Sequence, residues 1–600
     1  MGEVKIRIFN KFVLFNWNCL KFNLYHVKKS ADKIPKTLLL GFFSFLVFIF
    51  ISMVGLADEY RDVQASEILK QIENGEDVYL ENCRIVGELN LSKIKFETVP
   101  NPKYQEHLDF FYTVNKDLKV AESEISIHNS IFSNDLDFSN VLFKKSISFV
   151  EVNCSSFVNF TSTTFNNTVN FSGTAFGDSA FFHGATFNNT VNFSEATFSN
   201  STLYYDIRLG APGILFGDSA DFSKATFGDS ADFSGATFGN KADFLNATFG
   251  NNANFNGATF GDSARFGLSI YSDFLHHHHP GSLGATFGDS ADFSGATFGD
   301  SADFSGATFG DSADLSGAAF GDSADFWGAT FGDFASFGVS PFSAFDGFYD
   351  GGAVFGDSAD FFNANFGDSA DFEKSIFGNS TSFNSTTFGD SASFEYASFG
   401  DSASFKDTTF GDTVSFSATK FKSVSLNGTD FKEMKISWDS LENSLVFDGS
   451  TYVKLISNFR TLEQFEDADA AYYKYRSERQ ALKSWFSLSK WGDIFMCLTC
   501  GYGVRPFNTL LAGAGVVLLF SLFYWGRNGI SQSTKNNEVS NQKATLSDAF
   551  YFSIITFTTF GNNDWYPKYN FRKWAMLERL LGWLTLSLFL VTLTRVMIRP

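Results

Sequence analysis

Residues 220–230 read Ala-Asp-Phe-Ser-Lys-Ala-Thr-Phe-Gly-Asp-Ser, and nearly the same phrase begins again at Ala231. The phenylalanines here are spaced alternately five and six residues apart, at Phe222, Phe227, Phe233, Phe238, Phe244, Phe249, Phe255 and Phe260. This spacing is neither the 3.6-residue period of a helix nor the two-residue period of a strand. It predicts a square β-solenoid with sides of about five residues, in which Phe and the Ala two positions earlier face inward.

The same alternation links residues 138–198 and residues 355–416, which explains why 79 of the 600 residues are Phe. The repeat resembles the pentapeptide-repeat family, in the variant whose alternate sides carry one extra residue. The resemblance implies a right-handed quadrilateral β-helix over residues 131–431. Coils of about 22 residues, stacked ~4.8 Å apart, would give about thirteen coils and a rod of roughly 60 Å.

Three stretches break the repeat, at residues 206–214, 267–284 and 343–353, and we expect them to leave the solenoid as loops. The second contains His276, His277, His278 and His279. Four adjacent histidines can bind a divalent metal, but neighbours in an extended chain cannot all face one ion, so a solvated loop is the favoured interpretation.

Aspartates of the repeat should form outward-facing acidic columns. Those singled out are Asp229, Asp232, Asp289, Asp292, Asp300 and Asp303. They either serve only to keep the rod soluble and its edges unpaired, or also concentrate cations near a pore.

Net charge excludes one class of partner. At −21 the chain lacks the basic footprint that a nucleic acid requires. Five cysteines form no disulfide framework, and the Cys497-x-x-Cys500 pair is only a weak signal for redox or metal chemistry. No nucleophile–base pair, phosphate loop or metal-ligand spacing is evident, so we expect neither an enzyme nor a cofactor.

The N-terminal 57 residues predict a leader or transmembrane segment. Residues 38–57 carry no charge, lysines precede them and acidic residues follow. This pattern predicts a cytoplasmic N-terminus and an exported solenoid. Both a cleaved signal peptide, ending at Ala57, and an uncleaved anchor fit the pattern. Residues 58–130 predict a cap region with a short helix over 66–72, a turn at Asn74-Gly75 and first strands within 78–91.

Beyond the repeat, residues 432–505 predict a helical connector. One helix is expected over residues 459–488, rich in aromatic and charged side chains. A tight turn over residues 500–506 follows, and Pro506 suits the first position of the next helix.

Residues 506–600 predict a membrane domain. Apolar helices are expected over residues 507–524 and 574–598, and residues 544–567 between them combine an apolar run with a Thr-rich turn. The stretch Thr556-Phe-Thr-Thr-Phe-Gly-Asn-Asn-Asp564 resembles the filter of two-transmembrane cation channels of the potassium-channel superfamily, which reads Thr-x-Thr-Thr-x-Gly-Tyr-Gly-Asp. Asn562 replaces the expected Tyr, and Asn563 replaces the second Gly.

The resemblance implies a selectivity filter formed by Thr558, Thr559, Phe560, Gly561, Asn562, Asn563 and Asp564. Backbone carbonyls would replace the water shell of an ion, and one pore loop per chain implies a homotetramer. Asn tolerates left-handed dihedrals, so the backbone path can survive the two departures, whereas the bracing Tyr is lost. Potassium selectivity and weak selectivity among monovalent cations both stay open.

Function therefore has two candidate classes. The first is a multi-pass cell-membrane cation channel, most simply for potassium, with the acidic solenoid as sensor or interaction domain. The second is a membrane-anchored surface or scaffold protein whose pore-like hairpin does not conduct. An exported solenoid would place the pore loop on the cytoplasmic face, opposite to the usual channel, and the charges near the two C-terminal helices do not decide the orientation.

Overall fold

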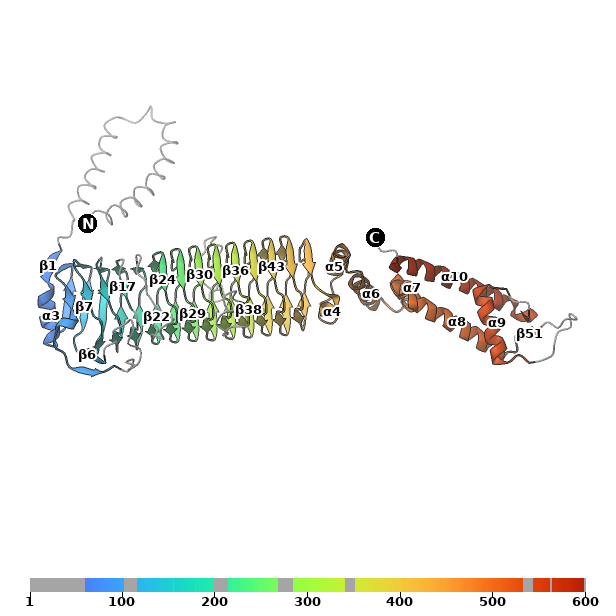
Figure 1. Ribbon diagram of the computed structural model, residues 1–600, viewed down its shortest axis with the longest axis horizontal. Helices are drawn as coiled ribbons and strands as arrows, with labels where there is room; N and C mark the ends of the chain where they lie inside the picture. Colours follow the sequence, from blue (N-terminus) through green and yellow to red (C-terminus); the bar gives the residue numbers. More distant parts are fainter. Residues whose placement is uncertain are drawn as a thin grey trace, which may run out of the picture. The chain divides into compact units, whose positions relative to one another are not determined.

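A computed structural model describes residues 60–101, 116–154, 156–177, 180–182, 184–198, 214–267, 284–339, 351–532, 543–561 and 564–597. The predicted leader, the histidines at 276–279, Asn562 and Asn563 lie outside the described residues. Residues 63–600 form one compact unit. Its first part is a solenoid of short strands stacked coil upon coil (Figure 1).

The solenoid has four faces, and the strands along each face pair in parallel, except β5 (Thr98–Pro100), which pairs antiparallel with β6. The first face contains β2 (Val78–Glu81), β7 (Ile125–His128), β11 (Ile147–Val150), β15 (Val169–Asn170), β19 (Val191–Asn192), β22 (Ser219–Asp221), β26 (Lys241–Asp243), β29 (Ser263–Arg265), β32 (Ser301–Asp303), β35 (Ser323–Asp325), β38 (Ser358–Asp360), β41 (Ser380–Ser382), β45 (Ser402–Ser404) and β49 (Val424–Ser425). The second contains β6 (Asp117–Ala121), β10 (Val141–Phe143), β14 (Thr164–Phe165), β18 (Thr186–Phe187), β21 (Leu215–Phe216), β25 (Thr237–Phe238), β28 (Thr259–Phe260), β31 (Thr297–Phe298), β34 (Ala319–Phe320), β37 (Val354–Phe355), β40 (Ile376–Phe377), β44 (Ser398–Phe399) and β48 (Lys420–Phe421).

The other two faces are discontinuous. The third contains β3 (Cys83–Val86), β8 (Ile131–Phe132), β12 (Asn153–Cys154), β16 (Ala175–Phe176), β20 (Thr197–Phe198) and β23 (Thr226–Phe227), then single bridges, then β42 (Thr387–Phe388) and β46 (Thr409–Phe410). The fourth contains β4 (Leu89–Asn90), β9 (Leu136–Asp137), β13 (Val158–Asn159) and β17 (Ala180–Phe181), followed by a sheet of β24 (Ser230–Asp232), β27 (Asn252–Asn254), β30 (Ser290–Asp292), β33 (Ser312–Asp314), β36 (Phe334–Ser336), β39 (Ser369–Asp371), β43 (Ser391–Ser393), β47 (Thr413–Ser415) and β50 (Glu433–Lys435).

Strand register confirms the repeat length. Ala220 pairs with Ala242, and Ala242 with Ala264, so one coil takes 22 residues. Pairing continues across the second break, where Ala264 pairs with Ala302. The coil after this break therefore resumes in register, because the inward Ala and Phe must return to the same face, while most residues of the three predicted breaks lie outside the described residues. The first two parallel neighbours on that face are β2 and β7, so pairing on this face begins at Val78, whereas β1 (Arg61–Gln64) is the neighbour of β3 on another face.

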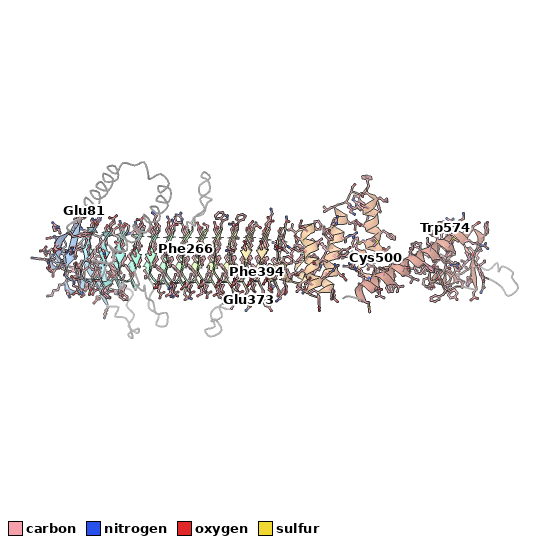
Figure 2. The ribbon with its side chains drawn as sticks, turned by 90° about the horizontal axis from the view of Figure 1, so that it is seen from above. Glu81, Phe266, Glu373, Phe394, Cys500 and Trp574 are labelled. Carbon is pink, nitrogen blue, oxygen red and sulfur yellow. The ribbon has the colours of Figure 1, made fainter. Side chains whose placement is uncertain are left out.

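The core is a set of stacked phenylalanines. The rings of Phe238 and Phe260 lie 4.6 Å apart and 1° from parallel, and both side chains are buried. Figure 2 draws these side chains and labels Phe266 and Phe394 among them. Some coils carry Thr at the small inward position: Thr163 donates its hydroxyl proton to the Phe138 carbonyl over 2.7 Å, so the added polar group stays paired. The prediction that Ala and Phe face inward is confirmed.

Short elements flank the coils. On the N-terminal side these are β1 (Arg61–Gln64), α3 (Ala65–Glu73), where a helix is predicted, and η2 (Leu91–Lys93). After the last strand come α4 (Trp438–Leu441), α5 (Gly449–Thr461) and α6 (Phe465–Ala481), whose buried side chains join the hydrophobic core of the solenoid. The single helix predicted over residues 459–488 is wrong: Glu463 adopts a left-handed conformation and separates α5 from α6.

The remaining elements form a helical hairpin with a short helix inside it. They are α7 (Leu488–Cys500), η5 (Gly501–Gly503), α8 (Pro506–Gly526), β51 (Ile530–Gln532), α9 (Leu546–Thr558), β52 (Trp565–Pro567), η6 (Tyr569–Phe571) and α10 (Arg572–Met597). By length and composition, α8 and the stretch Tyr569–Met597 can each cross a bilayer. The tight turn predicted after Cys500 is present, with Gly501 left-handed.

Candidate ion pore

The helix α9 packs against both long helices and ends in the filter-like stretch. Its start is fixed by a capping box: the Thr545 hydroxyl oxygen accepts from the Asp548 backbone N–H, and the Asp548 carboxylate accepts from the Thr545 backbone N–H. Its last helical residue is Thr558. An apolar run that enters between two spanning helices and then turns is the arrangement expected for a re-entrant pore loop.

The backbone after α9 alternates in handedness. Thr559 has a φ of +60° and Gly561 a φ of +70°, whereas Phe560 between them is outside the left-handed region. A positive φ is uncommon for a β-branched residue such as Thr, and strained residues of this kind gather at functional sites. Two positive φ values one residue apart exclude a regular strand here, because every residue of a strand has a negative φ.

These residues are uncovered in the single chain. Thr559, Phe560, Gly561 and Asp564 are all exposed, with Phe560 at 86%. The carbonyl-bearing segment therefore faces away from the packed interior of its own hairpin. Asn562 and Asn563 of the predicted filter lie outside the described residues.

Two glycines let the long helices close on the end of α9. A Cβ atom added at Gly582 of α10 would lie 2.0 Å from the Phe557 carbonyl oxygen. A Cβ atom added at Gly513 of α8 would lie 3.2 Å from the Phe557 ring. The last turn before the predicted filter is thus held between α8 and α10 by close packing against the helix backbone, which any larger residue at 582 would disturb.

A small hairpin secures the chain beyond the filter. Strand β51 pairs antiparallel with β52, and Ile530 and Trp565 are buried in one cluster with Tyr524 and Phe552. The segment that follows Asp564 is therefore tied to the end of α8. The sequence does not reveal this hairpin, because a three-residue strand leaves no periodic signal.

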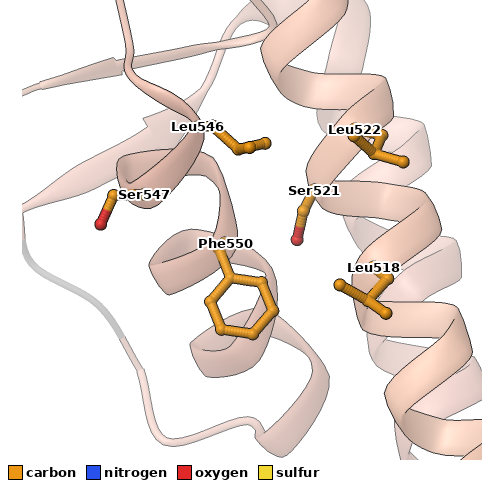
Figure 3. A pocket seen from close by; sticks show the side chains of 6 residues that line it. All are labelled: Leu518, Ser521, Leu522, Leu546, Ser547 and Phe550. Carbon is orange, nitrogen blue, oxygen red and sulfur yellow. The ribbon is translucent and has the colours of Figure 1, made fainter.

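A groove lies between α8 and the first half of α9. It is lined by Leu518, Ser521, Leu522, Leu546, Ser547 and Phe550 (Figure 3). The buried Ser521 hydroxyl already donates to the Val517 carbonyl over 2.6 Å. The apolar lining of this groove cannot replace the hydration shell of a cation, so we do not place the ion path in the groove.

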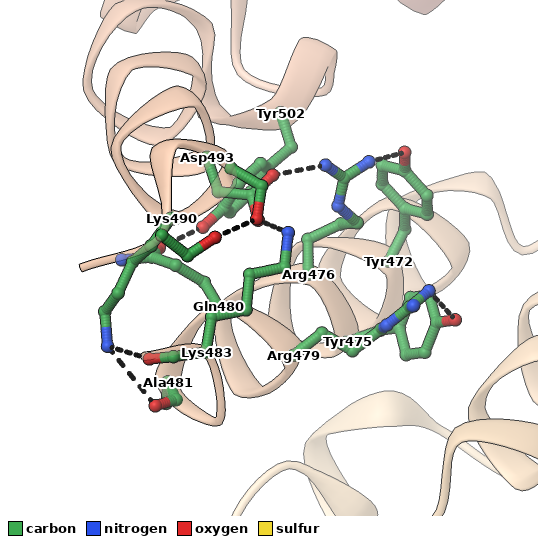
Figure 4. A network of polar contacts seen from close by, with 12 residues as sticks. Tyr472, Tyr475, Arg476, Arg479, Gln480, Ala481, Lys483, Lys490, Asp493 and Tyr502 are labelled. Atoms are coloured by element: carbon green, nitrogen blue, oxygen red, sulfur yellow. Dashed lines mark hydrogen bonds and ion pairs between the residues drawn. The ribbon is translucent and has the colours of Figure 1, made fainter. Parts of the chain in front are cut away.

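A polar network joins α6 to α7. Asp493 lies 2.9 Å from an Arg476 nitrogen and 2.5 Å from the Lys483 nitrogen (Figure 4). The hydrogen bond from Lys483 and the contact with Arg476 hold the pKa of the Asp493 carboxyl below its usual value. Such a paired carboxylate ties the connector helix to the helix that leads into α8.

Aromatic rings extend this junction to both spanning helices. The guanidinium of Arg505, which precedes α8, lies 3.7 Å from the centroid of the Tyr473 ring. That of Arg595, in the last turn of α10, lies 5.2 Å from the centroid of the Tyr472 ring. The helix α6 thus contacts the solenoid-side ends of both long helices through cation–π interactions.

The weak metal and redox signals gain no support among the described residues. Cys500 is buried and donates to the Met496 carbonyl, whereas Cys497 lies 3.5 Å from the Tyr473 hydroxyl. In the described part of the chain no three His, Cys, Asp or Glu side chains are grouped to hold a metal.

Part of the acidic surface has a structural role. Oδ1 of Asp232 accepts from the Ser234 backbone N–H, and Oδ1 of Asp292 accepts from that of Ser294, at 2.9 and 2.8 Å. Burial, with a smaller effect of neighbouring Asp314, raises the pKa of Asp292. The Asp that follows each inward Ala thus caps its own turn.

Sequence reasoning missed Glu578, Gly582 and Gly513. The only signal for Glu578 is a single carboxyl group in an apolar helix, which is itself a reason to suspect a role. The two glycines give no local signal in the sequence, because their role depends on the close contact of each with Phe557 in the folded hairpin.

Comparison with known families now adds independent support. A family model described as pentapeptide repeats (9 copies) matches residues 215–270, 283–330 and 293–340, and a model described as ion channel matches residues 510–599. No curated protein and no solved structure matches the chain. Together with the two apolar helices, the match makes this a membrane protein. The chain carries pentapeptide repeats in its β-solenoid and, after them, a potassium-channel-like ion channel domain.

Proposed function

We propose that four copies of this chain assemble into a channel for monovalent cations, chiefly potassium, with residues 558–564 as its selectivity filter. The observation that carries the proposal is the pair of positive φ values at Thr559 and Gly561, in an exposed stretch that directly follows a helix packed against both α8 and α10. Carbonyls that converge from four chains would replace the hydration shell of the ion. Asp564, exposed at the end of this filter segment, would raise the local cation concentration.

The exposure of the filter supports assembly. A cation in a filter needs oxygens on all sides, and one chain offers them on one side only. The apolar side chains of α8 and α10 that are exposed in the single chain, such as Leu519 and Leu590, suit contact with lipid or with neighbouring chains.

The solenoid would act as a sensor or partner platform coupled to the pore. Its core continues into α5 and α6, and α6 contacts the end of α10 through Tyr472 and Arg595. A partner that shifts α6 would change this contact, and the shift would reach the helix that packs on Phe557. Coupling of this kind needs a differential contact between two states of the junction.

Reconstitution tests the pore. We expect purified full-length protein to run as a tetramer and to release K⁺ from liposomes, with slower release of Na⁺. A tetramer that releases neither cation would favour the non-conducting scaffold. Equal rates for K⁺ and Na⁺ would keep the channel and remove potassium selectivity.

Orientation can be tested separately. The leader predicts an exported solenoid in a multi-pass protein. Asn166 is exposed on the solenoid, so a cysteine placed there by Asn166→Cys should react with a membrane-impermeant maleimide on intact cells. Labelling only after lysis would place the solenoid in the cytoplasm and the filter on the outer face.

A further inference from the structure

The carboxyl group of Glu578 is fully buried in α10 and touches both other helices of the hairpin. Its Oε2 accepts from the Tyr524 hydroxyl of α8 over 2.9 Å. Its Oε1 is hydrogen-bonded to the Ser553 hydroxyl in the middle of α9. One side chain therefore joins three elements that are far apart in the sequence.

No basic side chain of the described residues forms an ion pair with Glu578. Burial of a polar group without partners costs several kcal/mol, so a carboxyl group at this depth has to be held by hydrogen bonds. The two hydroxyl groups supply them. The Ser553 hydroxyl also lies 2.9 Å from the Val517 carbonyl oxygen, which extends the contact further along α8.

The same face of α10 contacts α9 at two points along the helix axis. Glu578 holds Ser553, and Gly582, one helical turn later, lies against the Phe557 carbonyl. Ser553 lies six residues before Thr559, the first left-handed residue of the filter. Because a helix rises 1.5 Å per residue, a small slip of α9 along α10 would displace the filter carbonyls by a distance that matters for coordinating an ion.

We propose that Glu578 is the positioning residue of the pore: its hydrogen bonds to Ser553 and Tyr524 fix α9 against α10 and α8 and thereby set the carbonyl spacing at Thr559–Gly561. The inference rests on the proposed channel function. Because its direct partners are hydroxyl groups and not cations, the proposal assigns the positioning of α9 to the hydrogen bonds of Glu578 and not to its charge. Glutamine has the same length and can accept from Tyr524 and donate to the Ser553 oxygen.

The test uses the full-length protein in liposomes and measures the K⁺/Na⁺ permeability ratio and the K⁺ flux per tetramer. Glu578→Leu should lower one or both by about two- to tenfold, the range that the loss of a net hydrogen bond produces. Ser553→Ala and Tyr524→Phe should give smaller losses in the same direction. Glu578→Gln should keep the permeability ratio and the flux close to the wild-type values. If Glu578→Leu also forms tetramers, a difference in permeability between the two variants reports on positioning and not on folding. Arg579→Gln, next to the site and exposed, is the matched control.

Each outcome has a definite meaning. If wild type shows no flux, the proposed function fails before the positioning role is reached. If wild type conducts and Glu578→Leu matches it in both measurements, Glu578 has no positioning role. If Glu578→Gln loses as much as Glu578→Leu while both form tetramers, the carboxyl group acts through its charge and the hydrogen-bond account is wrong. Should Leu prevent assembly, Ser553→Ala and Tyr524→Phe carry the test: unchanged selectivity and flux in both would overturn it.

Discussion

The guanidinium of Arg595, in the last turn of α10, lies over the ring of Tyr472 in the connector helix α6, 5.2 Å from its centroid. This contact joins the end of the pore hairpin to the helix that continues the solenoid core. The solenoid core is therefore connected to α10 through a contact that does not involve α8.

The Arg595–Tyr472 pair should behave as one unit in a double-mutant cycle. Arg595→Leu and Tyr472→Leu each remove the same cation–π contact, so the double variant should change K⁺ flux per tetramer no more than either single variant. The coupling energy between Arg595 and Tyr472, measured as the free energy of unfolding in the same cycle, should be about 0.5–1 kcal/mol. Fully additive effects would show that the two side chains act independently.

Gly582 should tolerate no side chain. A methyl group there would meet the Phe557 carbonyl oxygen at 2.0 Å, so Gly582→Ala has to push α9 away from α10. We expect a loss of stability of about 1–3 kcal/mol together with reduced flux. Thermal unfolding and flux measurements check both effects. Gly515→Ala, where an added Cβ atom meets nothing within 4 Å, is the control and should be close to wild type.

The phenylalanine stack should tolerate replacement of one Phe by Leu better than replacement by Ala, because Ala leaves a larger cavity. Phe244 stacks between Phe222 and Phe266 at 4.9 and 4.8 Å. Phe244→Ala should destabilise the coil by about 3–5 kcal/mol, whereas Phe244→Leu should cost less, because Leu315 occupies a fully buried inward position of this kind in the native chain. Hydrogen exchange of the full-length protein, read over the peptides around residue 244, measures the local difference. Equal protection in both variants would contradict this account of the core.

Acid should loosen the α6–α7 junction through Asp493. Its pKa is lowered by Lys483 and Arg476, so its contribution to stability is present above the unfolded-state pKa of about 3.9 and is lost as the pH falls through the lower folded-state value. Trp485 reports on the junction, since the Lys490 nitrogen lies 4.2 Å from the centroid of its ring. Tryptophan emission of wild type should therefore change below about pH 4. Asp493→Asn should already show the acid signal at pH 7 and little further change, and an identical pH transition in both proteins would rule Asp493 out as its origin.

The solenoid was predictable because each coil repeats the same local rule. Alternation of Phe222 and Phe227 with their inward alanines decides the period, and strand pairing keeps its register from one side of each break to the other. The membrane hairpin was predictable from hydropathy. The threonines and Gly561 predict a filter over residues 558–564, which stays a prediction until flux is measured. Residues 459–488 were mispredicted as one helix because both segments are good helix formers, and the left-handed turn at Glu463 is decided by packing.

The positioning contacts of the pore were out of reach of the sequence. Glu578 meets Tyr524 and Ser553 across separations of 54 and 25 residues, and no periodic pattern links these three positions. The same holds for Gly582 and Phe557, whose contact depends on how closely two helices approach. Such relationships exist only after the helices pack, because they are consequences of tertiary structure and not of local propensity.

The most direct test of the central claim compares K⁺ flux through wild type and Gly561→Val in liposomes, with Gly515→Val as the control. Gly561 has a φ of +70°, which a β-branched residue adopts only under strain, and it lies in the proposed filter. An added Cβ atom meets nothing within 4 Å at either glycine, so packing alone does not distinguish the two variants. The account predicts flux from wild type and Gly515→Val and none from assembled Gly561→Val. Undiminished flux through Gly561→Val would show that ions do not pass this stretch.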